Sequence, residues 1–150
     1  MYIWNTKNLA TDIKNNVVSQ RDWKNYYLTM SIFITIAIYL TTLSPRENLM
    51  SVAVEAIFVI GILIFGVSYT YESNKGEHGS DYIARMTALA LPVLVKLFML
   101  SLVFGVLVGV LSQALSLSES ALDWVMVVFA AVVQAIFFWR INFYIKYINA

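Results

Sequence analysis

The chain has 150 residues, of which 60% are hydrophobic and only 13% are charged, and its formal net charge is +1. A soluble domain of this size needs a larger share of charged residues at its surface, so the composition predicts a membrane protein whose outer faces contact lipid. The near-neutral charge and the lack of cysteine argue against a nucleic-acid partner and exclude disulfides, thiolate metal sites and cysteine nucleophiles.

The first 25 residues are largely polar and are predicted to form a cytoplasmic or interfacial segment. Leu9, Ile13 and Val17 recur at steps of four, with polar side chains around the rest of the helix. This pattern predicts a weakly amphipathic helix on the cytoplasmic membrane surface, with Trp4 as an interfacial anchor. The alternative is a solvated, partly helical tail.

Four apolar runs follow, and each is long enough to cross a hydrocarbon layer of about 30 Å as a helix. They cover residues 26–43, 49–71, 86–111 and 121–141. We therefore predict an all-α membrane protein, with a four-transmembrane-helix bundle of two hairpins over residues 26–150. The stretch 72–81, rich in glycine and serine, connects the two hairpins.

Basic residues are unevenly distributed among the polar segments. Eight of the ten lie at the two ends of the chain or in the central loop: Lys7, Lys14, Arg21, Lys24, Lys75, Arg85, Arg140 and Lys146. Because Lys and Arg collect on the cytoplasmic side, both termini and the central loop are predicted to face the cytoplasm. This bias, with short loops, is typical of a bacterial cytoplasmic (inner) membrane protein.

Three helix starts carry capping signatures, in which a side-chain oxygen accepts from a free amide at the start of the helix. Ser19 with Asp22 precedes the first run, and Ser120 with Asp123 precedes the fourth. Residues 44–47 place a serine, a proline and a glutamate before the second run. These signatures support the predicted span boundaries.

Lys96 carries the highest free-energy cost in the membrane, because its charge lies about 15 Å into the third run at 1.5 Å per residue. Glu55 of the second run has a similar depth, and we predict that the two pair where their helices adjoin. The pair would be a clamp between helices or a polar site in an ion or proton path. Pro92, four residues before Lys96, is predicted to kink the helix there.

Small residues form a stripe along the third run. Ser101, Gly105 and Gly109 recur every four residues and include a GxxxG motif. Such a stripe lets a second helix approach closely, so it predicts a packing surface, used either within the chain or against a second copy. A weaker stripe in the fourth run combines two alanines with a hydrogen-bonding glutamine: Ala131, Ala135 and Gln134.

The central loop holds His78, the only histidine of the chain, among acidic side chains. One histidine in a glycine-containing loop is more often solvated than a metal ligand, so we predict no metal site. Asp81 and Arg85 are four residues apart and are expected to pair on the helix surface. With Lys75, these residues define a cytoplasmic face on which a partner could dock.

Motifs of catalysis are missing, since the chain has no HExxH, CxxC, GxSxG or P-loop sequence. We therefore predict that the protein is not an enzyme and needs no cofactor. The favoured function is helix association, as a homo-oligomer or as an accessory subunit of a membrane complex. The alternative is an oligomeric channel, pore former or small transporter that uses Lys96 and Glu55. The expected partners are the lipid bilayer, other copies and other membrane subunits.

Overall fold

The structure is a computed structural model that describes residues 2–42 and 48–150, with residues 39–42 described in their backbone only. The described chain is helical and without strands, which confirms the predicted all-α class. Its elements are α1 (Thr6–Lys14), α2 (Gln20–Thr42), α3 (Leu49–Ser73), the 3₁₀ turn η1 (Gly76–His78), α4 (Tyr82–Leu115) and α5 (Glu119–Asn149).

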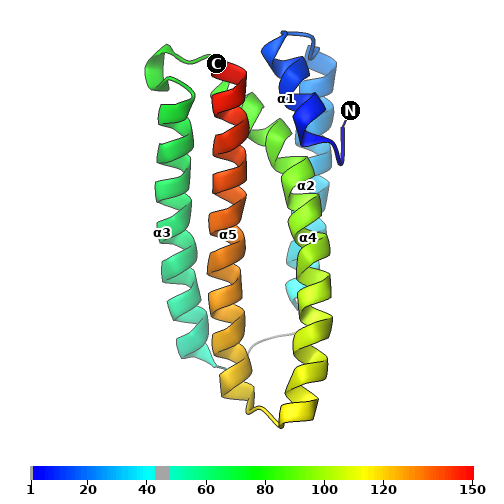
Figure 1. Cartoon of the computed structure of the whole chain (residues 1–150), viewed down its shortest axis with the longest axis vertical. Coiled ribbons are helices and arrows are strands. Elements are labelled where there is room, and N and C mark those ends of the chain that lie inside the picture. Colours follow the sequence, from blue (N-terminus) through cyan, green and yellow to red (C-terminus); the bar gives the residue numbers. More distant parts are fainter. Residues whose placement is uncertain (1, 43–47) are drawn as a thin grey trace.

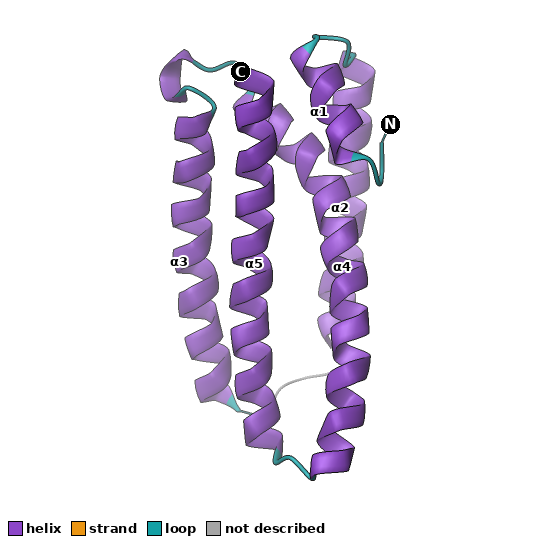
Figure 2. Cartoon of the chain, in the orientation of Figure 1, coloured by secondary structure: helices purple, strands orange, loops and turns teal. Residues whose placement is uncertain are grey.

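The four long helices run antiparallel in chain order (Figures 1 and 2). The most extensive contact is between α3 and α5, and α4 packs against both α5 and α2. Both termini, α1 and the loop around η1 lie at one end of the bundle (Figure 1). This arrangement makes α5 the helix that joins α3 to the rest of the molecule.

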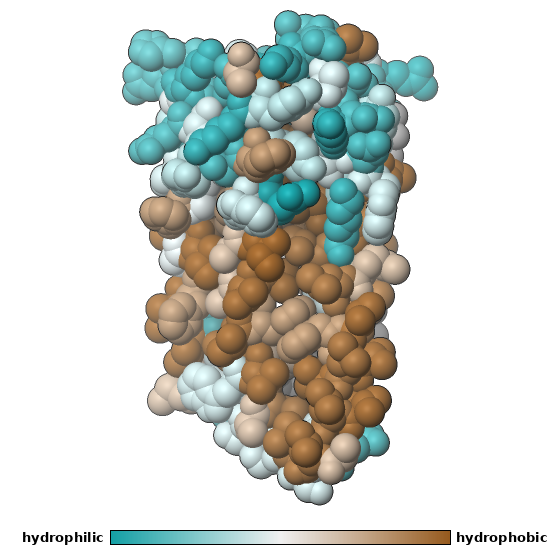
Figure 3. All heavy atoms as spheres, viewed as in Figure 1, coloured by the Kyte–Doolittle hydropathy of each residue, from teal (hydrophilic) through white to brown (hydrophobic). Residues whose placement is uncertain are grey.

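Three helices are long and apolar enough to cross a membrane, namely α3, α4 and α5. Within the described residues α2, which covers residues 26–42 of the first predicted run, does not meet that standard. Figure 3 shows hydrophilic side chains at the end that holds the termini and a largely hydrophobic surface below it. Three apolar helices with this surface suggest an integral membrane protein.

The N-terminal helix α1 is part of the protein core. Leu9, Ala10 and Ile13 are at most 3% exposed, and they belong to the buried cluster that α4 and α5 form at this end. The predicted helix therefore exists, but its apolar side chains pack against other helices instead of facing lipid. Val17 lies beyond the end of α1 and is 67% exposed, so the predicted apolar stripe stops at Ile13.

The buried residues of α4 lie in the half of the helix nearer the termini. They run from Ala88 to Val93 and include Leu97, and no residue of α4 beyond Leu97 is buried. Further along α4 the apolar side chains are open, as at Val106, which is 68% exposed. The buried part of α4 thus lies at the end that holds the termini, and the exposed apolar side chains further along the helix require lipid or another protein.

Close approach of α3 and α5 depends on Gly66. Its α-carbon faces the ring of Phe138, and a methyl group at this position would overlap that ring. Along the same seam the Gln134 amide donates to the carbonyl oxygen of Val59 at 3.0 Å. Position 66 therefore requires glycine, because α3 and α5 are too close there to leave room for a side chain.

Capping follows the sequence prediction at α2 and departs from it at α5. The Ser19 hydroxyl donates to Asp22 at 2.6 Å, and the Asp22 amide donates back to that hydroxyl, which confirms the predicted cap. This hydrogen bond lowers the pKa of the Asp22 carboxyl. In α5 the cap is Ser118, whose hydroxyl accepts from the Ala121 amide. The Ser120 cap is therefore wrong, because the helix starts two residues earlier.

Asn48 caps α3, since its side-chain oxygen accepts from the amides of Met50 and Ser51. The signature predicted at residues 44–47 lies outside the described residues. An asparagine supplies the same kind of side-chain acceptor as the serine that we expected to cap this helix.

A comparison of two glycines of α3 tests the packing of α3 on α5. Gly66→Ala should lower the free energy of unfolding by about 1–3 kcal/mol, because the new methyl group must displace Phe138. Gly61→Ala is the control, since a side chain there would meet no atom within 4 Å and should keep the gain of about 1 kcal/mol in helix propensity. Unfolding in detergent measures the stability of both variants. Equal stabilities would contradict the close approach of α3 and α5 at Gly66.

Candidate functional site

Lys96 contacts the N-terminal segment. Its ammonium group donates to the Thr6 hydroxyl at 3.3 Å and lies 5.7 Å from the centroid of the Trp4 ring. Thr6 is 1% exposed, so this hydrogen bond satisfies a buried hydroxyl at the start of α1. The lysine thus fastens α1 to α4.

The predicted pair of Lys96 with Glu55 is not found among the described residues, where the ammonium group of Lys96 contacts Thr6 and Trp4. Glu55 lies half-buried on α3, and α3 packs against α5 rather than making an extensive contact with α4. In Figure 1 α5 runs between α3 and α4. Similar depth was therefore not enough, because the contacts found between α3 and α4 involve Tyr82, Thr70 and Tyr71, which lie several turns away from Lys96 and Glu55.

Pro92 is buried in the α4 segment that packs near α1. Proline has no amide hydrogen, so the carbonyl of Ala88 loses its usual partner in the helix. The axis of α4 changes direction in its N-terminal third (Figure 1). A proline inside the helix accounts for a bend of this kind.

Arg85 connects three parts of the chain at the end that holds the termini. Its guanidinium donates to the side-chain oxygens of Asn74 and Asn149, both at 3.0 Å, and to the Ser80 hydroxyl at 2.9 Å. Asn74 is fully buried, and Asn149 also donates to the Ser73 carbonyl at 3.0 Å. Arg85 therefore holds the end of α3, the loop and the end of α5 together.

The expected surface pair of Arg85 with Asp81 is wrong. Asp81 has a left-handed backbone with φ of 53° and precedes α4, and in the described chain its carboxylate forms no ion pair with Arg85. The guanidinium donates instead to the side-chain oxygens of Asn74, Ser80 and Asn149. Lys75 and His78 remain exposed, at the two sides of the η1 turn.

The glycine stripe of α4 faces open space. A side chain added at Gly105 or Gly109 would meet no atom within 4 Å. Ser101, at the start of the stripe, is half-buried and donates to the Leu97 carbonyl of its own helix at 2.9 Å. The stripe is therefore not used for packing within the chain. On another side of α4, Phe104 stacks on Phe129 of α5 with ring centroids 3.8 Å apart.

The weaker stripe of α5 lies beside α3. Ala131 is half-buried, and Ala135 is exposed and lines an apolar pocket of about 340 Å³ with Gly66 and Phe138. Gln134 makes the contact between these helices through its hydrogen bond to Val59. The weaker stripe of α5 therefore packs within the chain, whereas Gly105 and Gly109 of α4 do not.

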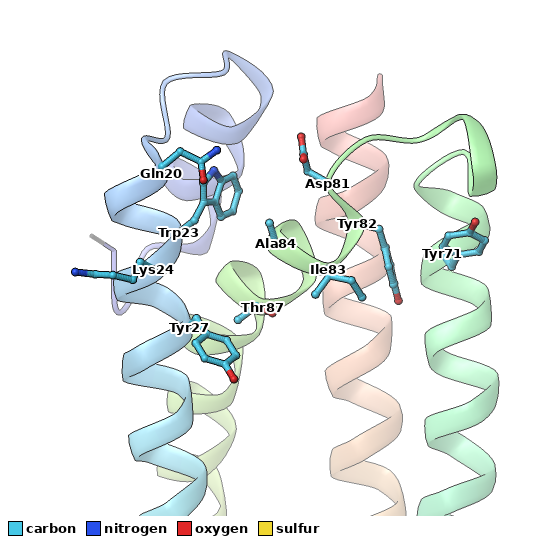
Figure 4. A pocket seen from close by; sticks show the side chains of 10 residues that line it. All are labelled: Gln20, Trp23, Lys24, Tyr27, Tyr71, Asp81, Tyr82, Ile83, Ala84 and Thr87. Atoms are coloured by element: carbon cyan, nitrogen blue, oxygen red, sulfur yellow. The ribbon is translucent and has the colours of Figure 1, made fainter.

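An open groove of about 760 Å³ lies between α2 and the start of α4. Aromatic side chains line it from three helices, as Figure 4 shows: Trp23, Tyr27, Tyr71 and Tyr82. Tyr82 is held by a bond of 2.8 Å to the Thr70 hydroxyl and by an edge contact with Tyr71. No motif in the sequence predicts this groove, because residues from three helices line it and only their packing brings them together.

Comparisons with family models, with curated proteins and with solved structures each found no match. The functional argument therefore rests on the chemistry of this chain. Its main elements are the open glycine stripe of α4, the N-terminal helix fastened by Lys96, and the hydrogen bonds of Arg85.

Replacing Arg85 with lysine tests its role at this end of the bundle. Arg85→Lys keeps the charge but loses the fork that reaches three acceptors, and each such hydrogen bond contributes about 1.5–3 kcal/mol. Hydrogen exchange of the amides in residues 74–80 should become at least about tenfold faster. Glu77→Gln, in the exposed part of the same loop, is the control and should leave exchange unchanged. Equal exchange in wild type and Arg85→Lys would refute this role.

Proposed function

We propose that the protein is an integral membrane protein without catalytic activity that acts by helix association, through the open glycine stripe of α4. Its partner is a second copy or a helix of a larger membrane complex, in which this chain is an accessory subunit. The observation that carries the proposal is the empty space around Gly105 and Gly109, in a helix apolar enough to cross a membrane.

The stripe has the properties that association in lipid requires. Lipid chains are as apolar as leucine, so helices there gain little from burying apolar surface and depend on close packing. Gly105 and Gly109 remove the side chains that would keep a second backbone away. Exposed apolar side chains such as Val106 and Leu102 border them and offer contact area to an incoming helix.

We also propose that four helices cross the membrane, with both termini and the central loop in the cytoplasm of a bacterium. The antiparallel order of the long helices supports this topology, since it gathers the termini, α1 and the loop at one end (Figure 1). That end is the hydrophilic one in Figure 3, and most of the basic residues belong to its segments.

The alternative of an oligomeric channel that uses Lys96 and Glu55 receives less support. Lys96 is occupied by Thr6 and Trp4, and its helix is not an extensive neighbour of the helix that carries Glu55. A conducting path needs polar side chains that line it continuously. Helix association explains the open stripe more directly.

Two bulky residues in the stripe test the association. Gly105→Leu with Gly109→Leu should convert the assembly in a native membrane mimic to a monomer, because the side chains prevent close approach. The subunit mass of the purified complex measures this change. Gly61→Leu is the matched control, since Gly61 is also open but lacks a second glycine four residues away. A wild-type monomer, or an assembly unaffected by both leucines, would refute association through this stripe.

Labelling of single cysteines tests the topology, because the natural chain has none. In intact bacterial cells a membrane-impermeant maleimide should label Leu117→Cys, between α4 and α5, and should reach Asn8→Cys and Glu77→Cys only after lysis. All three positions are exposed, so access depends on the side of the membrane. Labelling of Asn8→Cys in intact cells while Glu77→Cys stays protected would contradict four spans, and labelling of both would reverse the predicted orientation.

A further inference from the structure

A polar pocket adjoins the aromatic groove at the end of the bundle that holds the termini. The polar pocket, of about 180 Å³, lies between the end of α1, the start of α2 and the start of α4. The aromatic groove, of about 760 Å³, lies between α2 and the start of α4 (Figure 4). Gln20, Trp23 and Asp81 line both, so the polar pocket and the groove are neighbouring parts of one site.

The polar pocket holds one positive and one negative side chain. Arg85 and Asp81, at the start of α4, both line it, together with the side chains of Asn16 and Gln20. In the part of the chain that the structure describes these two charges do not pair, since the guanidinium donates to three other side chains. The pocket therefore presents an anion and a cation to whatever enters it.

The carboxylate of Asp81 is available to a ligand. Asp81 stands at the cap position of α4, where an aspartate usually accepts from a backbone amide, but its side chain makes no such hydrogen bond. Its left-handed backbone, with φ of 53°, differs from the extended backbone that capping requires. Arg85 uses three of the five N–H groups of a guanidinium, so it also keeps donors for a ligand.

The aromatic groove is mainly apolar. Trp23 and Tyr27 of α2 line it on one side, and Tyr82 and Ile83 of α4 line it on the other. Figure 4 shows that the side chain of Lys24 points away from these residues, so its charge lies outside the groove. An apolar groove beside a pocket with two charges matches an amphiphilic ligand with a charged head and an apolar body.

The apolar surface continues further into the bundle. The helices that line the groove also line a pocket of about 530 Å³, through Met30 of α2, Leu63 of α3 and Leu94 of α4. Met30 lies three residues beyond Tyr27, which is about 4.5 Å along the helix. An acyl chain that starts in the groove therefore meets a second apolar pocket as it runs toward the centre of the bundle.

The site lies where the surface changes from polar to apolar. Figure 3 shows hydrophilic side chains at the end that holds the termini and a hydrophobic surface below it. Gln20 is the first residue of α2, and Met30 is ten residues further on, at about 15 Å. Tryptophan and tyrosine prefer the level of lipid headgroups, which is the level that Trp23 and Tyr27 occupy in this arrangement.

We propose that the polar pocket and the aromatic groove together bind one phospholipid with a zwitterionic headgroup, phosphatidylethanolamine. Its phosphate accepts from Arg85, its ammonium group donates to Asp81, and its apolar part lies along Trp23 and Tyr27. The proposal rests on the membrane location of the protein but not on the glycine stripe, so loss of association in the leucine variants would leave it intact.

The test compares lipids with identical acyl chains, bound to the full-length protein in a non-ionic detergent and counted by native mass spectrometry. Phosphatidylethanolamine should bind about fivefold more tightly than phosphatidylglycerol, which lacks the ammonium group, and than phosphatidylcholine, whose methylated nitrogen cannot donate. Diacylglycerol, which lacks the phosphate, should bind at least about tenfold more weakly than phosphatidylethanolamine. This last comparison tests the role of Arg85 without changing its structural hydrogen bonds.

Asp81→Asn tests the recognition of the ammonium group. Asparagine has the same shape and tolerates a left-handed backbone, so the fold should be kept. The variant should bind phosphatidylethanolamine about fivefold more weakly and phosphatidylglycerol within about twofold of wild type. Glu77→Gln is the matched control, because it removes an exposed carboxylate of the same loop that lines neither the polar pocket nor the groove. It should keep the lipid preference of wild type.

Tyr27→Ala tests the apolar part of the site. Tyr27 is 66% exposed, and its loss should weaken all three phospholipids by about threefold without changing their order. Leu28→Ala is the control, since Leu28 is exposed on the same helix but does not line the groove. It should leave each affinity unchanged.

Several outcomes would overturn the proposal. Wild type that binds phosphatidylethanolamine and phosphatidylglycerol equally would show that the headgroup is not recognised, and tighter binding of phosphatidylglycerol would assign the site to an anionic lipid. An equal loss in Asp81→Asn and Glu77→Gln would place the ammonium group elsewhere. Displacement of the lipid by millimolar phosphoethanolamine would assign the pocket to a soluble ligand. If Asp81→Asn is misfolded by circular dichroism, the comparison of lipids on wild type decides.

Discussion

The packing of α1 against α4 and α5 is the contact on which the organisation of this protein depends. Leu9, Ala10 and Ile13 close a buried cluster with apolar side chains of both long helices. The same contact delivers Thr6 and Trp4 to Lys96, which would otherwise be a charge in an apolar helix without a partner. An N-terminal segment that sequence alone places on a membrane surface thus completes the core.

The two ends of the bundle obey different physical requirements. At the end that holds the termini, polar side chains meet inside the protein and must find hydrogen-bond partners, which Arg85 and Asn149 provide for each other. At the opposite end apolar side chains such as Val106 are exposed, and lipid is a suitable solvent for them. A tight polar end and an open apolar end are therefore compatible in one molecule.

Two parts of α4 have different surroundings. Gly105 and Gly109 lie in the part of the helix without buried residues, where close packing is the main attraction between helices. Lys96 lies nearer the termini, where it contacts Thr6 and Trp4 of the N-terminal segment.

The sequence by itself determined the all-helical class, the apolar helices and the cap of Ser19 on Asp22, because these depend on residues a few positions apart along one helix. Only the tertiary structure decided which side chains meet. Lys96 and Glu55 have similar depths but lie on helices that are not extensive neighbours, and Arg85 prefers Asn149 to the adjacent Asp81. Contacts of this kind depend on the order, rotation and tilt of the helices, which the spacing of residues within one helix does not specify.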